Sequence, residues 1–126
     1  MDFSIIHLPD VEDSAAKFGY GEMQESRFPR TALSAQDTGL AYHRVKPNQH
    51  QPFGHRHHEA EELHVVLAGS GWIKLDDERH EVRALDAIRV GPGVARGFEA
   101  GPDGLEYVVF GPHHEGESDM LRDFFE

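Results

Sequence analysis

The chain of 126 residues contains no cysteine. A disulfide-stapled scaffold, a zinc ribbon and a thiol nucleophile are therefore excluded together. Any bound metal ion would need histidine, carboxylate or backbone oxygen as its ligands. The ten histidines and 23 aspartates and glutamates supply such groups in quantity.

The sequence also lacks long apolar runs and clustered positive charge. No stretch reaches the roughly 18 consecutive apolar residues of a membrane span, and the N-terminal segment has no apolar core of a secretory signal. Only 12 residues are Lys or Arg, and the formal net charge is −11. Because phosphates and anionic lipids are bound by clustered cations, we expect no nucleic-acid partner and no membrane partner. We expect a single-domain, soluble, cytoplasmic protein.

Short β-prone runs dominate the middle of the chain. They are GLAYHRV, ELHVVLAG, GWIKLD, RHEVR, DAIRVG, RGFEAG and LEYVVFG. Turn signals separate them, among them Gly69-Ser70-Gly71, Gly91-Pro92-Gly93 and Gly101-Pro102-Asp103-Gly104. Many short strands at even spacing predict an all-β sandwich or barrel.

Two flanking segments differ from this pattern. Residues 1–36 show no sustained period, apart from a short helical turn expected to begin near Asp10 or Asp13 and to end at Gly19. We expect this arm to pack on the barrel of residues 37–112 or on a partner subunit. The C-terminal tail, residues 113–126, is acidic but carries four apolar side chains, so we expect it to fold back on the barrel. Those four are Met120, Leu121, Phe124 and Phe125.

The stretch GHRHHEAEELHVVLAGSG holds four of the ten histidines. On a strand, residues i and i+2 point the same way, so His55 and His57 project from one face. Glu62 opens the next apolar run, and a turn between the two segments brings its carboxylate beside both imidazoles. Two histidines and one carboxylate are the ligand set of non-haem iron(II) and of catalytic zinc with an open position. This pattern makes the three residues a candidate metal site.

Several alternatives stay open on spacing alone. A pair of histidines two residues apart also occurs on solvated surfaces. Glu61 competes with Glu62 for the carboxylate role, and His64, on the same strand face as Glu62, is either a fourth ligand or a hydrogen-bonded interior residue.

The same stretch resembles the first motif of the cupin superfamily, His-x-His, Glu and Gly, at His55, His57, Glu62 and Gly69. ALDAIRVGPGVARGFEAG resembles the second cupin motif, with Gly91-Pro92-Gly93 at its turn. The likeness extends over residues 39–112 and is strongest to small single-domain bacterial cupins of the cupin 2 type. It implies a double-stranded β-helix, or jelly-roll, barrel that forms a homodimer and holds a divalent transition metal (Fe, Zn, Mn or Ni).

The main departure from the cupin pattern is Arg96, which stands where the family places its last metal-binding histidine. Arginine stays charged and does not ligate a cation. Three outcomes follow: Arg96 turns away from a three-ligand site, it binds an anionic substrate beside the metal, or it pairs with Glu62 in a metal-free barrel. We expect the metal to be retained.

The resemblance implies a pocket that acts on or binds a small anionic molecule. Arg96, Phe98, His43 and Tyr42 are the expected substrate-binding residues, and the sequence assigns no catalytic residue. The hypotheses are a metal-dependent oxygenase, isomerase or related enzyme, a non-catalytic ligand-binding or sensing cupin, and a metal-free barrel with a Glu62–Arg96 ion pair. Fold alone does not choose among them.

Overall fold

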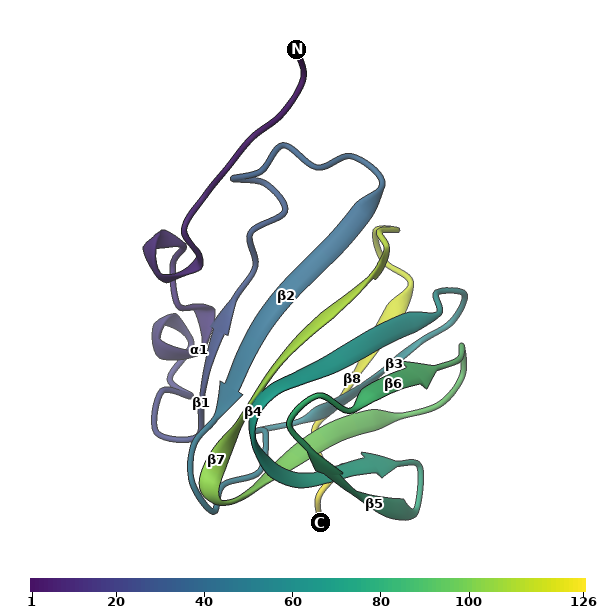
Figure 1. Ribbon diagram of the computed structural model, residues 1–126. Coiled ribbons are helices and arrows are strands. Elements are labelled where there is room, and N and C mark those ends of the chain that lie inside the picture. The colour runs from purple at the N-terminus through teal and green to yellow at the C-terminus, as the bar shows by residue number, and fades with distance from the viewer.

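The computed structural model describes residues 1–126 and is built mainly of β-strands (Figure 1). In chain order these are β1 (Gln24–Arg27), β2 (Thr38–Val45), β3 (Gly54–His57), β4 (Glu62–Leu75), β5 (Glu78–Arg83), β6 (Ala87–Val90), β7 (Arg96–Pro112) and β8 (Ser118–Leu121). A 3-10 turn (Leu8–Asp10) and helix α1 (Ser14–Lys17) precede them. No helix has the length and apolar character needed to cross a membrane.

All strand pairings are antiparallel, and the sheet curls over on itself (Figure 1). The order β1-β2-β7-β3-β8 forms one path, and β4 pairs with β5, β6 and β7. Strand β7 is central: its second half lies between β2 and β4, while its first residue, Arg96, pairs with His55 of β3. The expected all-β barrel is confirmed.

Two of the expected turns are wrong. Gly69-Ser70-Gly71 lies inside the continuous strand β4, and residues 101–104 lie inside β7. The ladder between β4 and β7 changes register near Gly69 and Gly71 instead of ending. A Cβ atom at either glycine would overlap a backbone carbonyl oxygen of the crossing strand, that of Gly104 or Glu99. These glycines therefore let two long strands bend across each other.

The core is a single cluster of buried side chains inside the curled sheet. Small and β-branched residues dominate it: Ala41, Val45, Val66, Ile73, Val82, Val90, Phe98, Ala100, Leu105, Tyr107 and Val109. At the open end of the barrel the cross-strand pairs are small, Gly39 with Gly111 and Ala41 with Val109. Interior space therefore remains at that end.

The N-terminal arm contributes β1, which pairs with β2. Asp13 caps α1, since its carboxylate accepts hydrogen bonds from the amides of the first helical turn. The same carboxylate accepts a 3.0 Å hydrogen bond from the backbone amide of Ser26, which ties the helix to β1. The predicted short helix near Asp13 is confirmed, and Gly19 follows it with a φ of 87°.

The C-terminal tail returns to the barrel through β8, which pairs with β3. The ring of Phe124 occupies the space where a side chain at Gly54 would lie. A Cβ atom at Gly97 would lie 2.6 Å from Cζ of Phe125. Met120, in contrast, is 52% exposed. The two terminal phenylalanines, but not Met120, close this end of the barrel.

Candidate metal centre and adjoining cavity

His55 and His57 lie on β3, and Glu62 is the first residue of β4. Nε2 of His55 lies 3.4 Å from Oε1 of Glu62, and Nε2 of His57 lies 3.2 Å from Oε2. One ligand atom from each residue falls within 4.8 Å of the other two. The i, i+2 geometry and the turn between β3 and β4 thus bring the three donors together.

This donor set fits a divalent transition metal. Two imidazole nitrogens from β3 and one carboxylate oxygen from β4, the next strand along the chain, converge, and such a ligand set leaves further coordination positions for water or a ligand. Glu61, the competing carboxylate, turns outward and pairs with Arg89 at 3.2 Å on the surface. Glu62 is therefore the acid that reaches the histidines.

Glu117 is an unexpected member of the site. Its Oε1 lies 2.7 Å from Nδ1 of His57, while Oε2 accepts hydrogen bonds from the backbone amides of His58 and Glu59. Fixing Nδ1 in this way leaves Nε2 of His57 directed at Glu62, the arrangement that positions metal-binding histidines. The sequence carries no local signal for Glu117, which reaches His57 only because β8 pairs with β3.

The charges of the cluster depend on one another. Hydrogen bonding to Glu62 raises the pKa of His57, against a smaller opposing effect of burial. Burial alone would raise the pKa of Glu62, but hydrogen bonds from His55 and His57 hold that pKa well below its ordinary value of 4.5. At neutral pH the cluster therefore contains an ionised carboxylate, and a bound cation would displace protons from the imidazoles.

Arg96 enters the barrel beside this cluster. Its side chain is 1% exposed, and its Nη1 lies 3.9 Å from Oε1 of Glu62, beyond hydrogen-bond reach. Nη2 donates to the carbonyl of Gly91 at 3.2 Å, but Nε and Nη1 are buried without a partner. Burial lowers the pKa of Arg96. The guanidinium faces Glu62 without a hydrogen bond to it and has two unused donor atoms.

His64 is buried on β4, and its ring lies against Phe98 and Tyr107 at centroid distances of 5.5 and 6.0 Å. Its Nδ1 has no hydrogen-bond partner. Burial lowers the pKa of His64 to about 4, so the ring is neutral at physiological pH. The three converging donors do not include it.

Of the remaining predicted residues, His43 and Phe98 lie inside the barrel and Tyr42 lies on the other face of the sheet. His43 points into the barrel, where Nδ1 lies 2.8 Å from Oγ of Ser26 and burial lowers its pKa to about 3. Phe98 is a core side chain stacked on Tyr107 at 4.0 Å. Tyr42 alternates with His43 on β2 and so faces the other side of the sheet, where its hydroxyl donates to Glu106.

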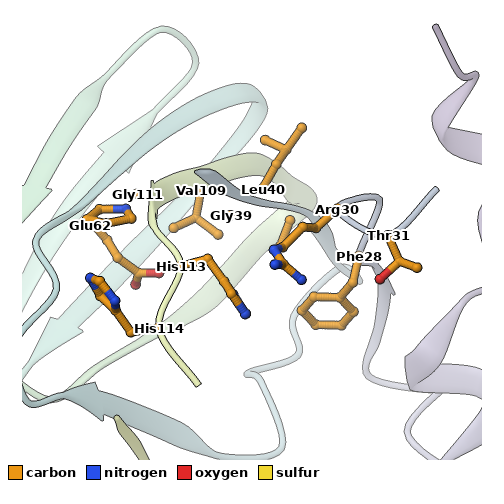
Figure 2. Close-up of a pocket in the computed structure, with 12 residues that line it drawn as sticks. Phe28, Arg30, Thr31, Gly39, Leu40, Glu62, Val109, Gly111, His113 and His114 are labelled. Carbon is orange, nitrogen blue, oxygen red and sulfur yellow. The ribbon is translucent and has the colours of Figure 1, made fainter. Parts of the chain in front are cut away.

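A cavity of about 300 Å³ adjoins the site at the open end of the barrel. Figure 2 shows the Glu62 carboxylate and the Arg30 guanidinium at opposite ends of it, with His113 between them. His114 lines the cavity beside Glu62. Only the fold reveals these three lining residues, because the arm and the end of β7 meet there.

Comparison with known proteins yields one family and several relatives. A family model described as the AraC-like ligand binding domain matches residues 37–123. The dimethylsulfoniopropionate lyase DddW of Ruegeria pomeroyi is 32% identical over 66 residues, which are 52% of this chain and 38% of that protein. The chain thus matches only about two fifths of the length of this curated relative.

Solved structures share the fold over nearly the whole chain. The polyketide cyclase RemF of Streptomyces resistomycificus superposes with a TM-score of 0.76 at 25% identity, covering 98% of this chain and 87% of that one. A cupin protein of Bacteroides fragilis superposes with a TM-score of 0.71 at 17% identity, covering 100% and 96%. The barrel is therefore a cupin barrel.

Proposed function

The chain belongs to the family of AraC-like ligand-binding domains, and on this premise we propose that its barrel binds a small carboxylate-bearing molecule beside a divalent transition-metal ion. His55, His57 and Glu62 would hold the ion, and Arg96 would hold the carboxylate. One observation carries the proposal: three convergent metal donors lie next to a buried guanidinium with two unpartnered nitrogens.

The metal part of the proposal rests on the donor set and its support. Glu117 orients His57 from outside the cluster, and this has no function in a merely solvated histidine pair. His64, whose buried Nδ1 has no partner, is the proposed fourth ligand. When bound, the ion would act as a Lewis acid or as an oxygen-activating centre.

The anion part rests on Arg96. A buried cation without hydrogen bonds to two of its nitrogens is costly, and a carboxylate that accepts from Nη1 would remove part of that cost. Glu62 does not provide these bonds, since its oxygen stands 3.9 Å away. The name of the DddW relative gives dimethylsulfoniopropionate, which carries a carboxylate, as the substrate of that enzyme, and this agrees with a carboxylate ligand. His43 and Phe98 would form the wall behind the ligand.

Non-catalytic binding is the second candidate, and the description of the family as ligand-binding domains favours it. The two similar proteins with enzymatic names, a lyase and a cyclase, favour catalysis. Both candidates require the same pocket. They differ in whether the bound molecule is recovered unchanged. Prolonged incubation of the ligand with metal-loaded protein, followed by chromatography of the ligand, distinguishes them.

Titration of the Zn²⁺-loaded protein with hexanoate, followed by calorimetry, tests the proposed pocket. We expect wild type and Arg83→Gln, which removes an exposed arginine on β5, to bind alike. Arg96→Gln should weaken binding about tenfold or more, because a charge-assisted hydrogen-bonded pair is lost. Equal affinities for wild type and Arg96→Gln, or no binding of hexanoate, benzoate or acetate, would refute the role of Arg96.

A further inference from the structure

The cavity at the open end of the barrel exists because the side chains along its floor are small. Gly39 faces Gly111 across β2 and β7, and Ala41 faces Val109. Strand β1 pairs with β2 only over Tyr42–Val45, so the chain leaves β2 at this point. Three of the following arm residues, Phe28, Arg30 and Thr31, form the outer wall. The floor is thus apolar and the wall comes from the arm.

The cavity does not share the strongly negative charge of the whole protein. The chain carries a formal net charge of −11, yet the ionisable groups lining the cavity are Arg30, His113, His114 and a single acid, Glu62. In the proposed function Glu62 is neutralised by the metal ion. What remains is a cation and two imidazoles at the outer end of an apolar cavity.

The guanidinium of Arg30 has hydrogen-bond donors that no acceptor uses. Its Nη2 makes one long contact of 3.5 Å with the carbonyl of Gln36, and its Nε is buried without a partner. Two backbone hydrogen bonds close the loop behind it, from Leu33 to the carbonyl of Pro29 and from Ala35 to that of Arg30. No carboxylate pairs with Arg30. Its guanidinium is held at the cavity wall without an anion.

We infer that this cavity is the outer half of the ligand site and that it selects a dicarboxylate with an apolar spacer. This inference rests on the proposed function, in which the first carboxylate lies on Arg96 beside the metal. The spacer passes Glu62 and lies over Ala41 and Val109, with Phe28 at the rim. The second carboxylate accepts hydrogen bonds from Arg30, with His113 and His114 at its side.

The test compares two ligands of one length, adipate and hexanoate, on the Zn²⁺-loaded protein. Without a cation at the far end, the second carboxylate of adipate would be desolvated at a cost and adipate would bind more weakly. We expect the opposite: adipate binds wild type about tenfold more tightly than hexanoate, as one charge-assisted contact provides. Equal or weaker binding of adipate overturns the inference.

Variants separate this inference from the proposed function. Arg30→Gln should abolish the preference for adipate and leave hexanoate affinity within about twofold, whereas Arg30→Lys should retain part of the preference. Arg83→Gln is the matched control and should retain all of it. If the preference survives in Arg30→Gln, the inference fails while the proposed function stands. If Arg96→Gln binds hexanoate as well as wild type does, the proposed function itself fails.

Discussion

Nη1 of Arg96 lies 3.9 Å from Oε1 of Glu62 inside the barrel, close enough for attraction and too far for a hydrogen bond. This spacing bears on the three outcomes expected for an arginine at the position of a metal-binding histidine. Arg96 has not turned away, and it does not form a hydrogen-bonded pair with Glu62. It stands beside the donor cluster with Nε and Nη1 unused.

Such an arginine should cost stability in the ligand-free protein. Arg96→Met keeps the length of the side chain and removes the buried charge, so we expect the free energy of unfolding to rise by about 1–3 kcal/mol. Urea unfolding of the metal-free protein measures this. The exposed control Arg83→Met should change stability by less than about 0.5 kcal/mol. A loss of stability in Arg96→Met would show that the guanidinium is already well satisfied.

Glu117 should govern metal affinity without touching the ion. Glu117→Gln leaves His55, His57 and Glu62 in place but weakens the hold on Nδ1 of His57, and we expect Zn²⁺ affinity to fall about 10–100-fold. Competition with a chromophoric chelator measures the dissociation constant. The neighbouring, exposed Glu115→Gln is the control and should bind as wild type does. Affinities within twofold of each other would remove Glu117 from the site.

The metal-free cluster should stabilise the fold over a limited pH range. The folded-state pKa of Glu62 is lowered, so its contribution is present above about 4.5 and is lost as pH falls through the folded value. The folded-state pKa of His57 is raised, so its contribution is complete below about 6.5 and is lost as pH rises through the folded value.

The difference in unfolding free energy between wild type and Glu62→Gln should therefore be largest between about pH 4.5 and 6.5. A magnitude of about 1–2 kcal/mol is expected for hydrogen bonds to a charged group that is partly exposed. Urea unfolding from pH 3 to 9 without metal checks the profile. A difference that does not vary with pH would mean that Glu62 and the imidazoles do not interact.

Packing of the tail against β7 can be tested at Gly97. A Cβ atom there would lie 2.6 Å from Cζ of Phe125, so Gly97→Ala should lower the free energy of unfolding by about 1–3 kcal/mol. In a Phe125→Ala background the same change should cost much less. Gly21→Ala, where the nearest atoms are 3.5 Å or more away, is the control. Equal costs in both backgrounds would place Phe125 elsewhere.

The parts of this site that sequence reasoning could predict are local. His55, His57 and Glu62 fall within eight positions, and strand alternation followed by one turn is enough to bring them together. The ends of the strands are harder to predict from the sequence. Gly69 and Gly71 predict a turn when they are taken alone. A glycine inside a strand, however, also marks a bulge or a close approach of another backbone. The choice depends on β7, which lies far away in the sequence.

The residues that could not be predicted from the sequence are those that long-range strand pairing brings to the site. Glu117 reaches His57 through β8, sixty positions later. Arg30 enters from an arm without periodicity, and His113 and His114 follow the end of β7. None of these has a local pattern that distinguishes it from a surface residue. For Arg96 the sequence left three outcomes open, and only the folded chain gives its distance from Glu62.

The most direct test of the central claim is the metal content of the untagged protein after reconstitution with iron, zinc, manganese and nickel, measured by mass spectrometry after desalting. We expect about one ion per chain in wild type and in His80→Ala, which removes an exposed histidine on β5, and almost none in His57→Ala. Equal, near-zero metal in all three proteins would contradict it.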